Sequence, residues 1–154
     1  MARIKMKLTY SLMDELMASP SSPLPEAKRV YQLQRMRQGL DSMINGKPTS
    51  YDWSVVSDSI NLLETLVDAG IAADTDGLLD EAVEAMVCAS VAIKKKAKAE
   101  LTDSQVNAIR AVLEDYEMCI NELPAREIIR THRRTEKRLL EIKRGKRQPQ
   151  DVVI

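Results

Sequence analysis

The chain of 154 residues is poor in aromatic side chains, with one Trp, four Tyr and no Phe. A core of this composition must be built from Leu, Ile, Val, Ala and the eight Met, which suit packing between helices. No segment of useful length alternates apolar and polar residues as a strand would. These absences favour an all-α fold, and we expect a bundle of four to six helices.

Histidine and cysteine are also scarce, with one His and two Cys. A single His excludes zinc sites built from several histidines, and Cys88 and Cys119 lack the C-x-x-C spacing of redox or zinc motifs. We expect both cysteines to be small buried residues in a reducing compartment. No cofactor or metal is predicted.

Long uncharged apolar runs are missing as well, and none approaches the roughly 18 residues of a membrane span. Lys5, Lys7, Asp14 and Glu15 interrupt the N-terminal segment where a signal peptide would need an apolar stretch. The predicted location is therefore cytoplasmic, without membrane contact.

Apolar residues at helical spacing, punctuated by Gly and Pro, predict the order of the helices. Start and stop signals place a short helix after Thr9 or Ser11, a second from Pro25 to Asn45, a third from Thr49 to Gly70, and a fourth from Asp74 or Thr75 to the lysines at 94–98. We expect one helical domain over residues 1–145 and a flexible tail over 146–154.

The stretch from Thr102 to Arg144 is the most strongly patterned part of the chain. Thr102 and Gln105 form a capping-box sequence, and Gly145 is a natural stop. Pro124 interrupts the stretch, and Leu123 before it is a poor helix cap. We therefore expect a long helix kinked at Pro124, with a clean break into two helices as the alternative. If it were straight, it would span about 65 Å, so its far half must fold back or project toward a partner.

Charge is sorted along the chain, although the formal net charge is zero. Residues 49–92 hold nine acidic side chains and no Lys or Arg, whereas residues 125–147 hold ten Lys or Arg and three Glu. These opposite charges can attract each other within one subunit or between subunits. The basic helix is open to three interpretations: a face that is solvated or paired internally, contact with nucleic acid or phosphate, or docking on an acidic protein surface. The candidate partner-binding residues are Arg126, Arg130, Arg133, Arg134, Lys137 and Arg138 on the basic side, and Asp74, Asp76, Asp80, Glu81 and Glu84 on the acidic side.

One pair of residues could carry catalysis. The spacing of Arg126 and His132 resembles the R-x4–6-H pattern of HEPN-type ribonucleases, which are all-helical and cut RNA across a dimer interface. Glu127 departs from the polar residue often found after that Arg, and a His on the stripe of a packed helix is the simpler interpretation. We assign no catalytic residue, and a HEPN-like ribonuclease remains a remote alternative.

Two longer stretches, Trp53 to Asp58 running on to Leu66 and Leu123 to Arg126 running into His132 and Arg133, resemble small helical accessory proteins of tailed phages and prophages of proteobacteria. That resemblance assigns no functional residue. It implies a protein that binds a host protein or a nucleic-acid-processing complex, including host-defence complexes, and modulates it. We expect such an interaction protein, acting as a homodimer, with nucleic-acid binding by the basic helix as the alternative.

Overall fold

The computed structural model describes residues 9–98 and 100–143, which contain six α-helices and no strand. The expected tail at 146–154 and the basic residues after Lys143 lie outside this part of the chain. The helices are α1 Leu12–Met17, α2 Glu26–Ile44, α3 Ser50–Asp68, α4 Leu79–Lys94, α5 Asp103–Glu122 and α6 Ala125–Lys143. The all-α prediction is confirmed. None of the described helices is long and apolar enough to cross a bilayer.

The helix ends follow the signals in the sequence. Ser11, Thr49 and Thr102 each form a capping box with the residue three positions later. Asp74 accepts hydrogen bonds from the backbone N–H groups of Leu78 and Leu79 and so caps α4 from the preceding turn.

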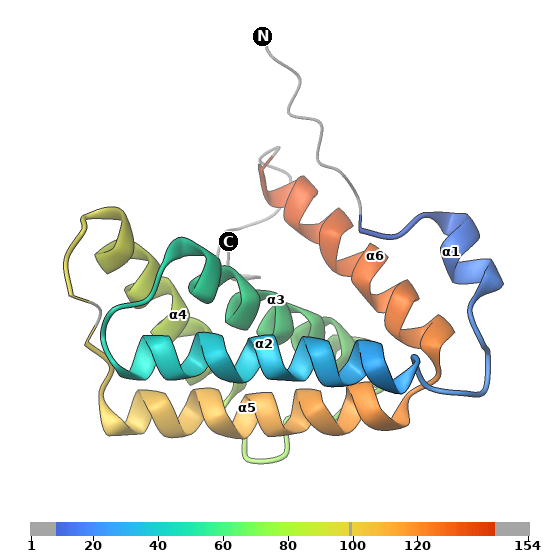
Figure 1. Ribbon diagram of the computed structural model, residues 1–154, viewed down its shortest axis with the longest axis horizontal. Coiled ribbons are helices and arrows are strands. Elements are labelled where there is room, and N and C mark those ends of the chain that lie inside the picture. The colour runs from blue at the N-terminus through green and yellow to red at the C-terminus, as the bar shows by residue number, and fades with distance from the viewer. Residues whose placement is uncertain (1–8, 99, 144–154) are drawn as a thin grey trace, which may run out of the picture.

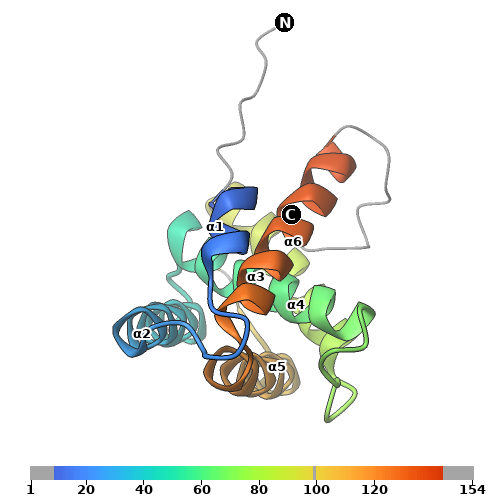
Figure 2. The same ribbon diagram turned by 90° about the vertical axis from the view of Figure 1, so that its right-hand side faces the viewer.

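Helix α3 is the centre of the bundle, and α2, α4, α5 and α6 all pack against it (Figures 1 and 2). From Val56 to Leu66 every residue except Asp58 is buried. The sequence predicts only one buried stripe here, yet a helix covered on all sides buries its polar positions too. Trp53 fastens the start of α3 to α4, since its indole N–H donates to the carbonyl of Met86 at 2.8 Å.

Polar side chains join α6 to α3 inside the bundle. Arg138 donates to Glu64 Oε1 at 2.5 Å and to the hydroxyl of Thr65 at 2.7 Å. The Thr65 hydroxyl in turn lies 2.8 Å from that of Thr135 on α6. Burial raises the pKa of Glu64 to about 7, although the hydrogen bond and charge of Arg138 oppose the shift. Because a buried charge is stable only with a partner, this network fixes the position of α6.

The chain breaks at Pro124, so the expected kinked helix is wrong. Leu123 is extended, with φ −75° and ψ 146°, as proline favours for the residue before it. The cap that Leu123 cannot provide comes from the loop between α1 and α2. Backbone N–H groups of Ala125 and Arg126 donate to the carbonyls of Ser22 and Ser19 at 2.8 and 2.9 Å. Helix α6 therefore turns back across α3 (Figure 1).

Several apolar positions lie at the surface, contrary to their expected place in the core. Val30 and Ile44 on α2 and Val87 on α4 are exposed, and so is Cys88, whereas Cys119 is half-buried against the core. Cys88 is exposed because α4 lies at the edge of the bundle, covered only by α3 and α5. Burial and the nearby Asp115 and Glu122 raise the pKa of the Cys119 thiol.

Gly39 generates the first testable prediction, because α3 packs closely against α2 at this position. A Cβ at this position would lie 2.9 Å from the backbone oxygen of Asp52 and 3.2 Å from Val56 Cγ2. Gly39→Ala should therefore lower the free energy of unfolding by about 1–2 kcal/mol, the strain exceeding the gain in helix propensity. Urea denaturation measures the change.

The matched control is Gln38→Ala, on an exposed position of the same helix, which should shift stability by less than about 0.5 kcal/mol. Equal stability of Gly39→Ala and the parent protein would show that the two helices do not meet as described.

Candidate interaction surface

Three arginines of α6 form a surface on which α1 packs. Arg126, Arg130 and Arg133 are spaced four and three residues apart, so they follow one stripe of the helix. Arg133 donates to Glu15 at 3.0 Å, Arg130 lies 3.6 Å from the same carboxylate, and Arg126 donates to the carbonyl of Leu16 at 2.9 Å. The first three predicted partner-binding arginines thus bind a segment of their own chain.

Helix α1 consequently has its acidic side buried and its apolar side exposed to solvent. Its buried residue is Glu15, which lies on the arginines. Its four apolar residues face solvent: Leu12, Met13, Leu16 and Met17 are 54, 64, 55 and 79% exposed. Figure 1 shows α1 at the edge of the molecule, packed on α6. Contiguous exposed apolar groups of this kind are typical of a binding surface.

The other three basic candidates on α6 differ in whether they form ion pairs. Arg138 is bound to Glu64, and its other guanidinium nitrogen lies 3.7 Å from Asp68. One arginine of α6 therefore pairs with carboxylates of the acidic region, residues 49–92. Arg134 and Lys137 are exposed and take part in no ion pair among the described residues. They lie beside the arginines that contact α1, because Lys137 continues the stripe of Arg130 and Arg133.

The five acidic candidates lie in the turn before α4 and in the first turns of α4, which packs on α3 and α5. Asp74 caps the helix, and Glu81 accepts a hydrogen bond from the hydroxyl of Ser104 at 2.5 Å. Asp76, Asp80 and Glu84 are exposed. Asp80 is close enough to Glu64, the partner of Arg138, to contribute to the raised pKa of that carboxylate. No ion pair joins any of the five acidic candidates to a basic candidate in the described part of the chain.

Arg126 and His132 do not share a cavity in the described structure. Arg126 is engaged with Leu16, whereas His132 lines a space between α2, α3 and α6 and packs edge-on against Tyr10, with ring centroids 5.4 Å apart. Burial, with a smaller contribution from Lys28, lowers the pKa of His132 to about 4. The imidazole is therefore neutral at pH 7. No cluster of three or more His, Cys, Asp or Glu side chains suited to a metal occurs among the described residues.

In comparisons with known proteins, no family model, no curated protein and no solved structure matches this chain. The resemblances to phage accessory proteins and to HEPN-type ribonucleases therefore remain predictions.

The exposed face of α1 is the feature that the sequence did not predict. Its apolar residues were expected, but a short amphipathic helix is ordinarily assumed to turn them inward. A signal was present in two places: two acidic residues, Asp14 and Glu15, lie between the two apolar pairs of α1, and an arginine stripe lies on α6. Neither shows by itself that the two segments meet.

His132 generates a pH-dependent prediction. Its pKa is lower in the folded chain, about 4, than the ordinary 6.5, so between these values the unfolded chain binds more protons. The His132 contribution to stability is therefore complete above pH 6.5 and is lost as the pH falls toward 4, by up to about 3 kcal/mol. In His132→Asn this loss should be absent, so the stability difference between parent and variant should shrink or reverse across this range.

Urea denaturation at several pH values measures that difference. At pH 7.5 the imidazole is neutral in the folded and the unfolded chain, so the stability difference measured there reports the change in packing alone. Asp58→Asn is the counterpart. Although the Asp58 residue stays partly exposed, desolvation of its carboxylate, followed by the charge of Glu136, raises its pKa to about 6, so its effect has the opposite sign. A parallel pH profile for the parent and His132→Asn would contradict a buried neutral imidazole.

Proposed function

We propose that this protein is an interaction protein that binds a partner protein through α1. The observation that carries the proposal is the outward apolar face formed by Leu12, Met13, Leu16 and Met17. Leaving these side chains in water forgoes burial that would favour folding, by about 1.5–3 kcal/mol for a fully buried Leu or Met. A partner that covers the face recovers this free energy.

The way α1 is held supports a docking role. A hydrogen bond from Arg133 to Glu15, an ion pair between Arg130 and Glu15, and a hydrogen bond from Arg126 to the carbonyl of Leu16 orient the helix. Its apolar side chains are therefore presented without being used in the core. Two of the four are Met, whose flexible thioethers adapt to surfaces of different shape.

The charges beside α1 define the chemistry of the partner. Arg134 and Lys137 are exposed, and the side chain of Arg130 keeps 38% of its surface accessible. The complementary partner offers an apolar groove with an acidic rim. The resemblance to phage accessory proteins makes a host protein or a host nucleic-acid-processing complex the expected bearer of such a groove. No catalytic step is needed in this function.

Direct binding of nucleic acid is the second candidate, favoured by the unpaired Arg134 and Lys137. It is weaker, because Glu15, Glu64 and Glu127 already neutralise much of the described α6. Nucleic-acid affinity would fall steeply with added salt.

The test compares three variants. Met13→Glu/Met17→Glu places charge on the apolar face of α1, and Arg134→Glu/Lys137→Glu reverses the adjacent charge. Met118→Glu alters an equally exposed methionine, 58% accessible, on α5 and is the matched control. Because all of these side chains are exposed, each variant should keep the circular dichroism spectrum and the unfolding transition of the parent.

In nuclease-treated host lysate, we expect a protein with an acidic, apolar docking site to bind the parent and Met118→Glu. After purification, that protein should bind the two other variants at least ten-fold more weakly, a loss of about 1.4 kcal/mol each. Binding insensitive to the α1 variant would reject the proposal. So would retention that nuclease abolishes, which indicates nucleic acid, or a concentration-dependent increase in sedimentation that α1 controls without another protein, which indicates a homodimer.

A further inference from the structure

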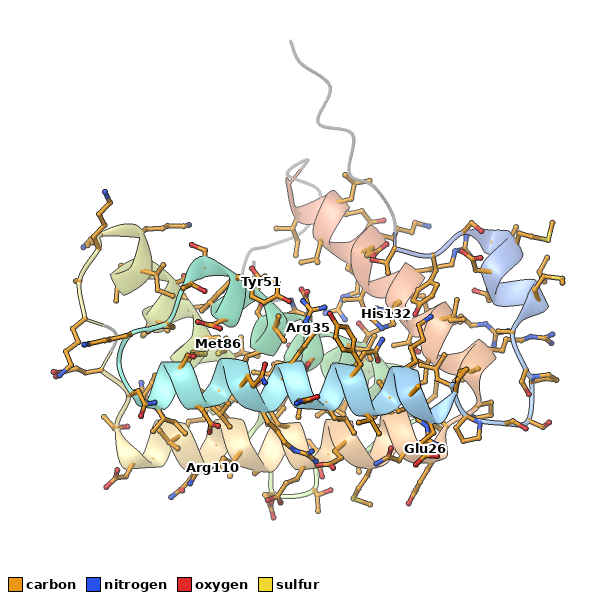
Figure 3. The ribbon with its side chains drawn as sticks, viewed as in Figure 1. Glu26, Arg35, Tyr51, Met86, Arg110 and His132 are labelled. Atoms are coloured by element: carbon orange, nitrogen blue, oxygen red, sulfur yellow. The ribbon has the colours of Figure 1, made fainter. Side chains whose placement is uncertain are left out.

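A second surface lies on α4, which packs on α3 and α5. The buried side of α4, which holds Met86, faces the core (Figure 3). Five residues on the other side of the helix are exposed: Asp80, Glu84, Val87, Val91 and Lys94. Their positions are four, three, four and three residues apart, so they follow one narrow stripe, which we call the α4 stripe. This spacing is typical of the seam along which one helix packs on another.

The middle of the α4 stripe is apolar. Val87 and Val91 are 44 and 46% exposed and lie one turn apart, so they form one patch. Both are β-branched, and the helix therefore restricts their side chains without burying them. A partner that covers the two valines removes apolar surface from water, which favours association.

The two ends of the α4 stripe carry opposite charges. Asp80 and Glu84 lie in the first half of the helix, and Lys94 is its last residue. None of the three takes part in an ion pair among the described residues. The helix dipole favours acidic residues in the first turn, but Glu84 lies beyond that turn. Asp80 and Glu84 are also four residues apart, where like charges destabilise a helix. A cation from a partner would relieve this repulsion.

We propose that the α4 stripe binds the α4 stripe of a second copy of this chain, with the two helices antiparallel about a two-fold axis. Along the helix the stripe is acidic, then apolar, then basic, so it becomes complementary to itself when one helix is reversed. A parallel pair would place like charges opposite each other. The surface is separate from α1, so this inference does not rest on the proposed function.

One register satisfies the charges and the valines together. When Glu84 of one copy lies opposite Lys94 of the other, Val87 lies opposite Val91, because each valine is three residues from its charged neighbour. The two-fold axis repeats both contacts, so every pair occurs twice. Because α4 has 16 residues and spans about 24 Å, the contact is small, and we expect a Kd in the micromolar range.

Sedimentation velocity of the intact chain at increasing concentration tests the proposal. The parent should show a monomer–dimer equilibrium, which Met13→Glu/Met17→Glu should leave unchanged because α1 is outside the interface. Val87→Glu should weaken the dimer by about ten-fold or more, since it buries a charge between the helices. Val30→Glu is the matched control, because Val30 on α2 is 55% exposed and lies outside the stripe.

Charge reversal tests the partner and its orientation. Glu84→Lys places two cations opposite each other, and Lys94→Glu places two anions opposite each other, so each variant alone should be monomeric where the parent dimerises. An equimolar mixture of the two should form a heterodimer, because every opposite pair is then attractive. The double variant Glu84→Lys/Lys94→Glu should dimerise like the parent. All these side chains are exposed, so circular dichroism should show the parent fold.

The proposal is overturned if the parent stays monomeric up to millimolar concentration, or if Val87→Glu dimerises as tightly as the parent. It is also overturned if the mixed charge variants stay monomeric. A dimer that Met13→Glu/Met17→Glu abolishes would place self-association on α1 instead. A monomeric parent that retains a different protein from lysate, in a manner that Val87→Glu prevents, would show that the α4 stripe binds another partner.

Discussion

The pairing of Arg138 with Glu64 in the middle of the bundle is the constraint from which the other features follow. A carboxylate buried on the central helix is stable only with a partner, and Arg138 of α6 provides it. With α6 held against α3 at this point, Arg126, Arg130 and Arg133 contact α1. His132, Thr135 and Glu136, on another face of α6, line the space that α6 shares with α2 and α3. Both features therefore depend on one helix whose position is set by a buried ion pair.

Local physical chemistry accounts for what the sequence could predict. The capping boxes at Ser11, Thr49 and Thr102 and the turns at Gly46 and Gly70 depend on neighbouring residues alone, so the order and approximate ends of the helices could be predicted. Pro124 could not be interpreted in this way. Leu123 is a poor cap, and the groups that replace it are backbone carbonyls roughly a hundred residues earlier in the chain. A backbone acceptor has no sequence signature.

The candidate interaction surface also combines features that are visible in the sequence with features that depend on tertiary contacts. The segregation of charge was visible in the sequence, but which charges remain available depends on tertiary partners. Glu15 engages Arg130 and Arg133, although Arg130 stays partly accessible, and Asp74 is used as a cap. Arg134, Lys137, Asp80 and Glu84 stay exposed. The space lined by His132 was not predicted, because Gln32, Asp58 and His132, which border it, belong to three helices and form no motif in any one of them.

The capping of α6 by Ser19 and Ser22 also bears on how the chain is made. The loop that carries these carbonyls is synthesised more than a hundred residues before Ala125 and Arg126. Until then the loop has no helix to cap, and Glu15 has no arginines to bind. Helix α1 and the loop that follows it therefore lack their contacts with α6 during most of translation. Contacts so distant in sequence slow folding, so the last helix to be made is also the one that brings the first into place.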